Sequence, residues 1–176
     1  MANIKGNVVV ITGNGKGKTT SALGRCLEGW LKGKKVMILQ FIKGEKSYGE
    51  LKLPDMLGDT FGIKQTGLGF VRNSDHAIEQ HRQNALKALD EARRLIKSNT
   101  YDILVLDEIN YAVHFNLLTE EQVIETIDQK PDSLMIIMTG RYARDAIIGK
   151  SDEVYEFKEI KHYSSAGVLA REGIEY

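Results

Sequence analysis

Four short runs of mostly apolar residues recur along the chain, at residues 7–11, 36–41, 103–106 and 134–138. These runs do not alternate with polar residues, which is typical of strands buried on both faces of a parallel sheet. Residues 61–65 are a shorter candidate strand, and residues 154–160 are expected to add a last strand at or near an edge. The pattern therefore predicts a mostly parallel sheet.

Between these runs, apolar residues recur at helical spacing. The first predicted helix ends near Gly33, and its apolar face is formed by Leu23, Cys26, Leu27, Trp30 and Leu31. A second helix is expected from Ser74 or Asp75 to about Lys97. Its inward face is predicted to comprise Ile78, Ala85, Leu89, Ala92 and Ile96.

A third helix is expected at residues 119–128, where Thr119 and Gln122 are spaced to cap each other reciprocally. Leu118 and Val123 can pack together across the same helix start. Alternating strands and helices imply a three-layer α/β sandwich, in which the first strand–helix–strand crossover is right-handed. We find no repeat or linker, so residues 1–176 are predicted to form a single domain.

The segment between the first strand and the first helix is the most informative part of the chain. It reads Thr12-Gly13-Asn14-Gly15-Lys16-Gly17-Lys18-Thr19-Thr20. Without Cβ atoms, its glycines let successive N–H groups turn inward, and the next helix offers its positive dipole end to the same anion. Lys18 is placed to reach terminal phosphates and Thr19 to ligate Mg²⁺. The segment is predicted to be a phosphate-binding loop.

This loop departs in one respect from the usual G-x-x-x-x-G-K-T spacing. The first glycine should fall at position 12, but Thr12 stands there and Gly13 comes one residue late. Because the loop is one residue tight, the pattern alone leaves open which phosphate is attacked, or whether any is.

Charged residues follow other predicted strands, at the sheet edge where the phosphate loop is expected. Asp107 and Glu108 follow the third apolar run, and two carboxylates there suit Mg²⁺, or Mn²⁺ in its place. The alternative is that these two side chains only cap the next segment. Arg141 follows the fourth run and can bind phosphate oxygens, with a surface salt bridge as its alternative. Lys43 follows the second run. We give equal weight to two positions for its side chain, one in this site and one in solvent.

Composition narrows the function classes. Lys plus Arg and Asp plus Glu are both 24, so the net charge is zero and a dominant nucleic-acid role is not suggested. The single cysteine, Cys26, is interpreted as a small core residue and not as a reactive thiol. No stretch reaches about 18 apolar residues and no secretion signal is visible, so we expect a cytoplasmic protein that does not act at a membrane.

Several motifs, in order across nearly the whole chain, resemble the ATP:corrinoid adenosyltransferases of the CobA/BtuR/CobO type. Besides the phosphate loop they are Gln40-Phe41-Ile42-Lys43-Gly44, Gly67-Leu68-Gly69-Phe70, Leu106-Asp107-Glu108-Ile109-Asn110-Tyr111, Thr139-Gly140-Arg141, Ile160-Lys161-His162 and the tail at residues 167–176. The resemblance implies a three-layer P-loop (RecA-like) fold with a mostly parallel central sheet flanked by helices.

The resemblance also implies transfer of the 5′-deoxyadenosyl group of ATP to the Co(I) centre of a reduced corrinoid, with release of triphosphate. Cobalamin, cobinamide and cobyrinic acid a,c-diamide are the candidate corrinoids, in adenosylcobalamin biosynthesis or salvage. Cobalt would be the nucleophile. This agrees with the sequence, in which no combination of Ser, His and Asp, and no pair of Cys and His, stands out as an activated nucleophile. Members with this tight loop bind ATP in the reversed direction. A homodimer and a flavoprotein electron donor are the partners that the resemblance suggests.

Carried over by position, the triphosphate would be cradled by Gly13, Asn14, Gly15, Lys16, Gly17, Lys18, Thr19 and Thr20. Thr19 and Glu108 would hold Mg²⁺ with Asp107 nearby, and Arg141 would bind phosphate. Lys18, Glu108 and Arg141 are therefore the candidate catalytic residues.

Phe70 would face the corrinoid, but the resemblance breaks at Arg72, where enterobacterial members have tryptophan.

Two other functions stay open. One is a P-loop ATPase or kinase in which Glu108 activates water or a hydroxyl for attack on the γ-phosphate. The other is a regulatory module that binds nucleotide without chemistry.

Overall fold

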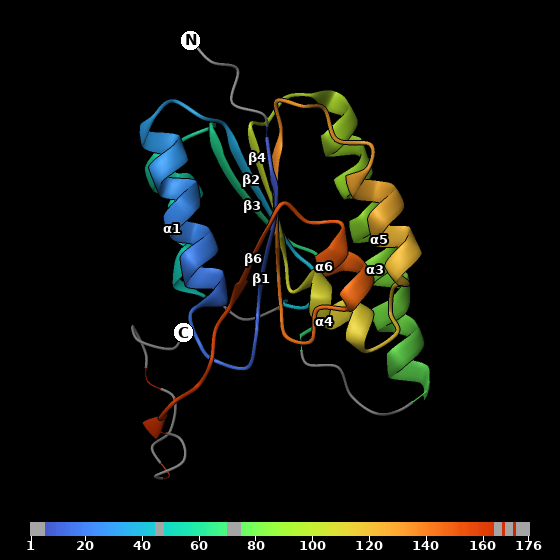
Figure 1. Ribbon diagram of the computed structural model, residues 1–176. Coiled ribbons are helices and arrows are strands. Elements are labelled where there is room, and N and C mark those ends of the chain that lie inside the picture. Colours follow the sequence, from blue (N-terminus) through green and yellow to red (C-terminus); the bar gives the residue numbers. More distant parts are fainter. Residues whose placement is uncertain (1–5, 45–47, 70–74, 164–166, 168–170, 172–176) are drawn as a thin grey trace.

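A six-stranded parallel sheet runs through the centre of the protein (Figure 1). The computed structural model describes residues 6–44, 48–69, 75–163, 167 and 171. The strands are β1 (Val8–Thr12), β2 (Val36–Gln40), β3 (Phe61–Gln65), β4 (Ile103–Asp107), β5 (Met135–Thr139) and β6 (Glu153–Glu156). Their order across the sheet is β3-β2-β4-β5-β1-β6, and every neighbouring pair is parallel. The predicted parallel α/β architecture is confirmed.

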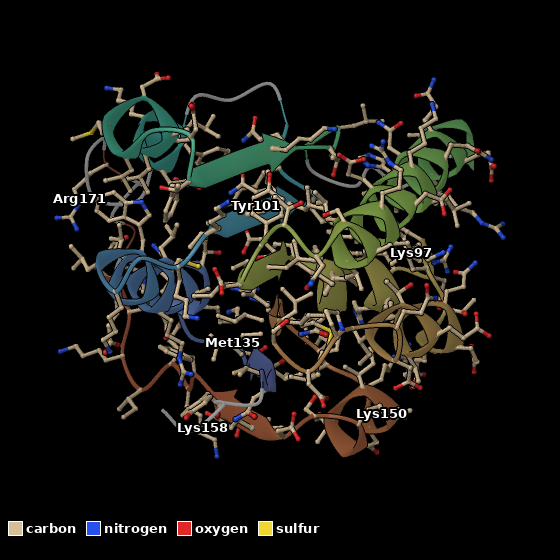
Figure 2. All side chains as sticks on the ribbon, turned by 90° about the horizontal axis from the view of Figure 1, so that it is seen from above. Lys97, Tyr101, Met135, Lys150, Lys158 and Arg171 are labelled. Atoms are coloured by element: carbon tan, nitrogen blue, oxygen red, sulfur yellow. The ribbon has the colours of Figure 1, made fainter. Side chains whose placement is uncertain are left out.

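Helices cover both faces of this sheet, as the view from above in Figure 2 shows. On one face lie α1 (Lys18–Leu31) and α2 (Leu53–Leu57), the latter preceded by the 3₁₀ helix η1 (Gly49–Lys52). The other face carries α3 (Asp75–Ser98), α4 (Ile109–His114), α5 (Glu120–Ile127) and α6 (Asp145–Gly149). None of the helices in the described part is long and apolar enough to cross a bilayer.

Successive residues of the central strands enter two separate cores, because side chains alternate across a strand. In β1, Val9 and Ile11 pack in the cluster that contains Cys26 of α1, whereas Val8 and Val10 pack in the cluster that contains Leu89 of α3. The uniformly apolar runs of the sequence are explained by this burial on both faces.

The topology gathers polar residues at one end of the sheet. β1 and β2 follow each other along the chain, yet β5 and β4 lie between them. Gln40, the last residue of β2, is the register partner of Asp107, and Thr139 at the end of β5 is the partner of Ile11. The carboxyl ends of these strands are therefore level with the start of the phosphate loop.

Several predicted details are confirmed. β3 spans residues 61–65 as expected. At the start of α5, the Gln122 N–H donates to the Thr119 hydroxyl and the Thr119 N–H donates to the Gln122 side chain, so the reciprocal cap is present. Leu118 and Val123 are buried in the same core cluster.

Other expectations are wrong at element ends. Leu31 is 77% exposed because it is the last residue of α1, and Ile78 is 37% exposed because it lies in the first turn of α3. η1, α2, α4 and α6 were not predicted, since elements of four to six residues are too short to display a helical period.

A pair of isoleucines tests the packing. Replacing Ile137 of β5, which is fully buried, by alanine leaves a cavity, and we expect a loss of about 2–5 kcal/mol in the free energy of unfolding. The control Ile160→Ala removes the same atoms from a side chain that is 99% exposed and should change stability by less than about 0.5 kcal/mol. Denaturant unfolding followed by circular dichroism measures both, and equal losses would contradict the burial.

Cys26 provides a second test. Burial, with a smaller contribution from the charge of Asp107, raises the pKa of the Cys26 thiol to about 12. An exposed thiol with a pKa of about 8.5 is largely thiolate at about pH 9, whereas Cys26 stays protonated until the pH approaches 12. We expect an aromatic disulfide reagent to modify Cys26 at pH 9 only after unfolding in guanidinium. Rapid modification of the native protein would show that the thiol is accessible.

Candidate functional site

The loop between β1 and α1 is shaped by glycine and by the chain that follows β6. Gly13 and Gly17 have φ angles of 97° and 104°, which L side chains rarely adopt. A Cβ atom on Gly13 would lie 2.4 Å from the carbonyl oxygen of Phe157. The backbone beyond β6 therefore lies against the loop, and glycine is required at position 13.

Two backbone hydrogen bonds secure this contact. The Gly15 N–H donates to the Phe157 carbonyl at 2.7 Å, and the Phe157 N–H donates to the Thr12 carbonyl at 2.8 Å. Successive N–H groups of the loop were expected to turn toward an anion, but the Gly15 N–H is bonded to the chain segment after β6. The anion-binding role of the loop rests on its other residues.

Lys18 lies at the bottom of the loop and is buried. Its ammonium group donates to the carbonyl oxygens of Gly13 at 2.8 Å and Gly15 at 2.7 Å. Burial lowers the pKa of Lys18; Arg141 acts in the same direction, and Glu108 and Asp107 act against it. Within the described residues no carboxylate forms an ion pair with Lys18. The loop therefore holds a cation whose charge is available to an anion.

Asp107 is the centre of a buried hydrogen-bond network. One carboxylate oxygen, Oδ1, accepts from the Thr19 hydroxyl at 2.8 Å and from the Thr139 hydroxyl at 2.6 Å. The Thr139 hydroxyl also accepts the Glu108 N–H at 3.0 Å. Asp107 thus joins the first turn of α1 to the ends of β4 and β5.

The other oxygen of Asp107 faces a second set of polar groups. Oδ2 lies 3.4 Å from the Lys43 ammonium and 3.4 Å from the Gln40 amide nitrogen. Both nitrogens also contact the Glu50 carboxylate of η1, Lys43 at 2.8 Å and Gln40 at 3.1 Å. The Gln65 side-chain amide donates to the side-chain oxygen Oε1 of Gln40 at 3.1 Å. The structure therefore places Lys43 at this site and not in open solvent.

The charges in this second set stabilise one another. Burial alone would lower the pKa of Lys43, but Asp107 and Glu50 outweigh it and hold that pKa above its ordinary value. Burial opposes ionisation of Glu50 in the same way, and Lys43 reverses the effect, so the pKa of Glu50 is lowered. Lys43 and Glu50 are consequently both charged at neutral pH.

Glu108 differs from its neighbour Asp107. Its backbone has φ 64°, an unusual conformation for a residue other than glycine, and it is the N-cap of α4. Burial and then the charge of Asp107 raise the pKa of Glu108, against the influence of Lys18, Lys43 and Arg141. Its carboxylate makes no hydrogen bond or ion pair to any described residue. This carboxylate is available to a ligand.

Arg141 follows β5 and is exposed near the same groups, since its charge acts on both Lys18 and Glu108. Among the described residues it has no ion-pair partner, so the surface salt bridge is not seen there. It lines a cavity of about 630 Å³ together with Asn14, Tyr142, Glu156, Lys158 and Glu159. The guanidinium therefore stands beside an open space that adjoins the phosphate loop.

The oxygen atoms of Thr19, Asp107 and Glu108 are the donors that a magnesium ion could use. Hydroxyl and carboxylate oxygens suit Mg²⁺, which prefers hard ligands. In the described part of the chain, no group of three or more His, Cys, Asp or Glu side chains forms a further metal cluster. The donor chemistry fits Mg²⁺ and does not resemble a zinc site.

The remaining predicted residues have varied positions. Asn14, Lys16 and Thr20 are exposed on the loop and the first turn of α1. Phe70 and Arg72 lie outside the described residues, so their predicted corrinoid contacts stay predictions.

Sequence reasoning assigned no role to Thr139, Gln40, Glu50 or Gln65. Thr139 directly follows the predicted fourth strand, and Gln40 is a polar residue within an apolar run, which are signals that could have identified them. Glu50 and Gln65 lack such a signal, because only the fold brings them to Gln40.

Thr139 provides a test of the network. In Thr139→Val the Glu108 N–H loses its acceptor and Asp107 loses a donor, so we expect stability to fall by about 1–3 kcal/mol and nucleotide affinity to fall with it. Thr139→Ser, which keeps the hydroxyl, should bind nucleotide normally.

Thr126→Val is the matched control, since Thr126 is equally buried but bonds to Gln122 and Arg93 on the α5 side. It should lose similar stability and keep its nucleotide affinity. Unfolding curves and titration calorimetry with ATP measure both quantities. Equal loss of affinity in the two valine variants would show that the effect is not local to the site.

Both the sequence and the fold of this chain are similar to those of known proteins. The family model for ATP:corrinoid adenosyltransferase BtuR/CobO/CobP matches residues 4–176. The corrinoid adenosyltransferase of Escherichia coli is 35% identical over 175 residues, which cover 98% of this chain and 86% of that protein. The corrinoid adenosyltransferase CobA of Salmonella typhimurium shows the same identity and coverage.

Among solved structures, a KaiC-like protein from Pyrococcus horikoshii OT3 superposes with a TM-score of 0.56. The match covers 89% of this chain and 75% of that one at 18% sequence identity, so it shows the P-loop, RecA-like fold and nothing about activity. Together with the phosphate loop on a parallel sheet, the family match along the chain leads to one conclusion. The chain belongs to the ATP:corrinoid adenosyltransferase family, whose members are enzymes that use ATP and a corrinoid.

Proposed function

We propose that this protein transfers the 5′-deoxyadenosyl group of ATP to the Co(I) centre of a reduced corrinoid and releases triphosphate. Family membership supports both substrates. The observation that carries the proposal is the composition of the site. The charges of Lys18, Arg141 and Glu108 act on one another, and the hydroxyls of Thr19 and Thr139 both donate to Asp107. The site has groups for a polyanion, and neither hydroxyl is paired with a histidine or lysine base.

The chemistry needs no protein nucleophile. Co(I) supplies an electron pair to C5′, a Co–C bond forms, and the C5′–O bond breaks with its electron pair leaving on the triphosphate. No proton has to be removed from the nucleophile. The tasks of the protein are to align C5′ with the metal and to stabilise the negative charge on the departing oxygen. Lys18 and Arg141 are the cations positioned for the second task.

We assign Thr19, Asp107 and Glu108 to the binding of Mg²⁺, or of Mn²⁺ in its place. When bound, the ion neutralises charge on the phosphate oxygens. Lys43 supplies a positive charge 3.4 Å from the buried carboxylate of Asp107. Thr139 orients the Asp107 carboxylate and the start of α4.

The tight loop supports the reversed direction of ATP that the family resemblance implies. Gly13 comes one residue late, and the chain beyond β6 occupies the N–H of Gly15, so this part of the loop offers fewer donors than a standard loop. We assign Phe70 and Arg72 to the corrinoid side of the site.

We further propose that residues 1–176 act as one adenosyltransferase domain in a cytoplasmic homodimer. A flavoprotein would supply the electron that forms Co(I), in adenosylcobalamin biosynthesis or salvage. The homodimer, the flavoprotein donor and the biosynthetic role follow the family resemblance, whereas the single domain and the location follow the sequence.

A second candidate function is hydrolysis or transfer of the γ-phosphate. The raised pKa of Glu108 and its unpaired carboxylate suit a general base acting on water or a hydroxyl. Such an enzyme would form ADP, whereas adenosyl transfer forms triphosphate and no ADP.

The decisive experiment incubates the protein with Mg-ATP and chemically reduced cobalamin or cobinamide. We expect the corrinoid spectrum to change as the Co–C bond forms, with triphosphate as the phosphate product. ADP and orthophosphate without a new Co–C bond would support the ATPase or kinase instead. Binding of Mg-ATP with neither product would indicate a regulatory module.

Lys18→Ala and Glu108→Ala should each lower adenosyl transfer by about 10²-fold or more, since each removes a charge at the reacting triphosphate. Lys97→Ala is the control, because Lys97 is exposed near the end of α3 that lies farthest from the phosphate loop (Figures 1 and 2). Initial rates of Co–C bond formation give the comparison. Near-normal rates in both site variants would overturn the assignment.

A further inference from the structure

The chain after β6 contacts the phosphate loop again through Tyr163. The ammonium group of Lys16 donates a hydrogen bond of 2.7 Å to the Tyr163 phenol oxygen, across 147 positions of sequence. The same nitrogen is 4.9 Å from the centroid of the ring, a separation that a hydrogen bond to the hydroxyl already produces. The contact is therefore directed at the hydroxyl.

The ring of Tyr163 is itself held in place. The His162 ring lies 4.1 Å away between centroids, and the guanidinium carbon of Arg171 lies 4.8 Å from the Tyr163 centroid. Figure 2 places Arg171 on the side of the sheet that α1 covers, which is the side the loop leads into. The Tyr163 side chain thus contacts two cations, Lys16 of the loop and Arg171 near the end of the chain.

The chemistry of the contact leaves Lys16 able to bind an anion. A phenol is neutral, so it does not cancel the lysine charge as a carboxylate would. An ammonium group has three donors, and two remain after the bond to Tyr163. No carboxylate of the described residues forms an ion pair with Lys16. Because the long side chain is already anchored, less conformational entropy is lost when a ligand binds.

We propose that Tyr163 is a positioning residue for the triphosphate. It holds Lys16 at the phosphate loop, so that this cation binds the phosphates of ATP and of the leaving group. The triphosphate is named on the basis of the proposed function, but its binding can be measured without any corrinoid.

The test compares Tyr163→Phe, which removes only the hydroxyl, with the unmodified protein. We expect the affinities for Mg-ATP and for inorganic triphosphate, measured by calorimetry, to fall about three- to tenfold. In the transfer assay the KM for ATP should rise by the same factor, with kcat and the KM for the corrinoid unchanged.

Tyr155→Phe is the matched control. The Tyr155 hydroxyl donates to Glu153, and Arg25 lies 4.5 Å from the ring centroid, so the setting is similar but these partners are not loop residues. This variant should bind ATP and triphosphate normally. Equal weakening in both phenylalanine variants would overturn the proposal, as would no change in Tyr163→Phe.

A double-mutant cycle separates positioning from a general structural effect. Lys16→Met should weaken triphosphate binding by at least as much as Tyr163→Phe, and the second change should add nothing to the first. Additive losses would show that Tyr163 acts by another route. Lys16 is exposed, so the Lys16→Met comparison stays informative if Tyr163→Phe fails to fold.

The two proposals fail in different ways. One outcome is that the losses of triphosphate affinity in the Lys16 and Tyr163 variants are non-additive but no Co–C bond forms. This outcome would leave the positioning role intact and reject adenosyl transfer. Adenosyl transfer with unaltered triphosphate binding in Tyr163→Phe would do the reverse.

Discussion

The fully buried carboxylate of Asp107 is the group on which the rest of the site depends. An ionised group in the interior is costly unless hydrogen bonds and opposite charge compensate it. Here both oxygens are used: one accepts from two threonine hydroxyls, and the other faces Lys43 and Gln40. These partners come from α1, β2, β5 and the segment after β2. Satisfying one carboxylate therefore fixes four elements relative to one another.

The same requirement organises the charges around it. Lys43 compensates Asp107 and Glu50 at once, so this part of the site is nearly complete without a ligand. Glu108 and Lys18 are different, because neither forms an ion pair within the described residues. The protein thus separates the network around Asp107 from two charged groups, Lys18 and Glu108, that have no ion-pair partner among the described residues and can act on phosphate and metal. Such a division keeps a site preorganised while its reactive groups stay available.

The chain beyond β6 completes the phosphate loop from the other side. Its backbone at Phe157 bonds to Thr12 and Gly15 of the loop, and its side chain at Tyr163 bonds to Lys16. The path of this tightly spaced loop therefore depends on contacts with a segment that is distant along the chain. A loop one residue shorter than usual can follow this path because an edge strand lies against it and glycine occupies position 13.

Much of this architecture is readable in the sequence. Local properties determine it: uniformly apolar runs select strands buried on both faces, a capping pair starts α5, and glycines with a lysine and a threonine form the loop. Ordered motifs also identify the family. In contrast, the neighbours of Asp107 depend on strand order, because β4 lies beside β2 and β5 although these strands are far apart along the chain. Only the tertiary structure decided that Glu50, Gln65 and Tyr163 reach the site, since side-chain contacts between distant segments leave no periodic or local signal in the amino-acid sequence.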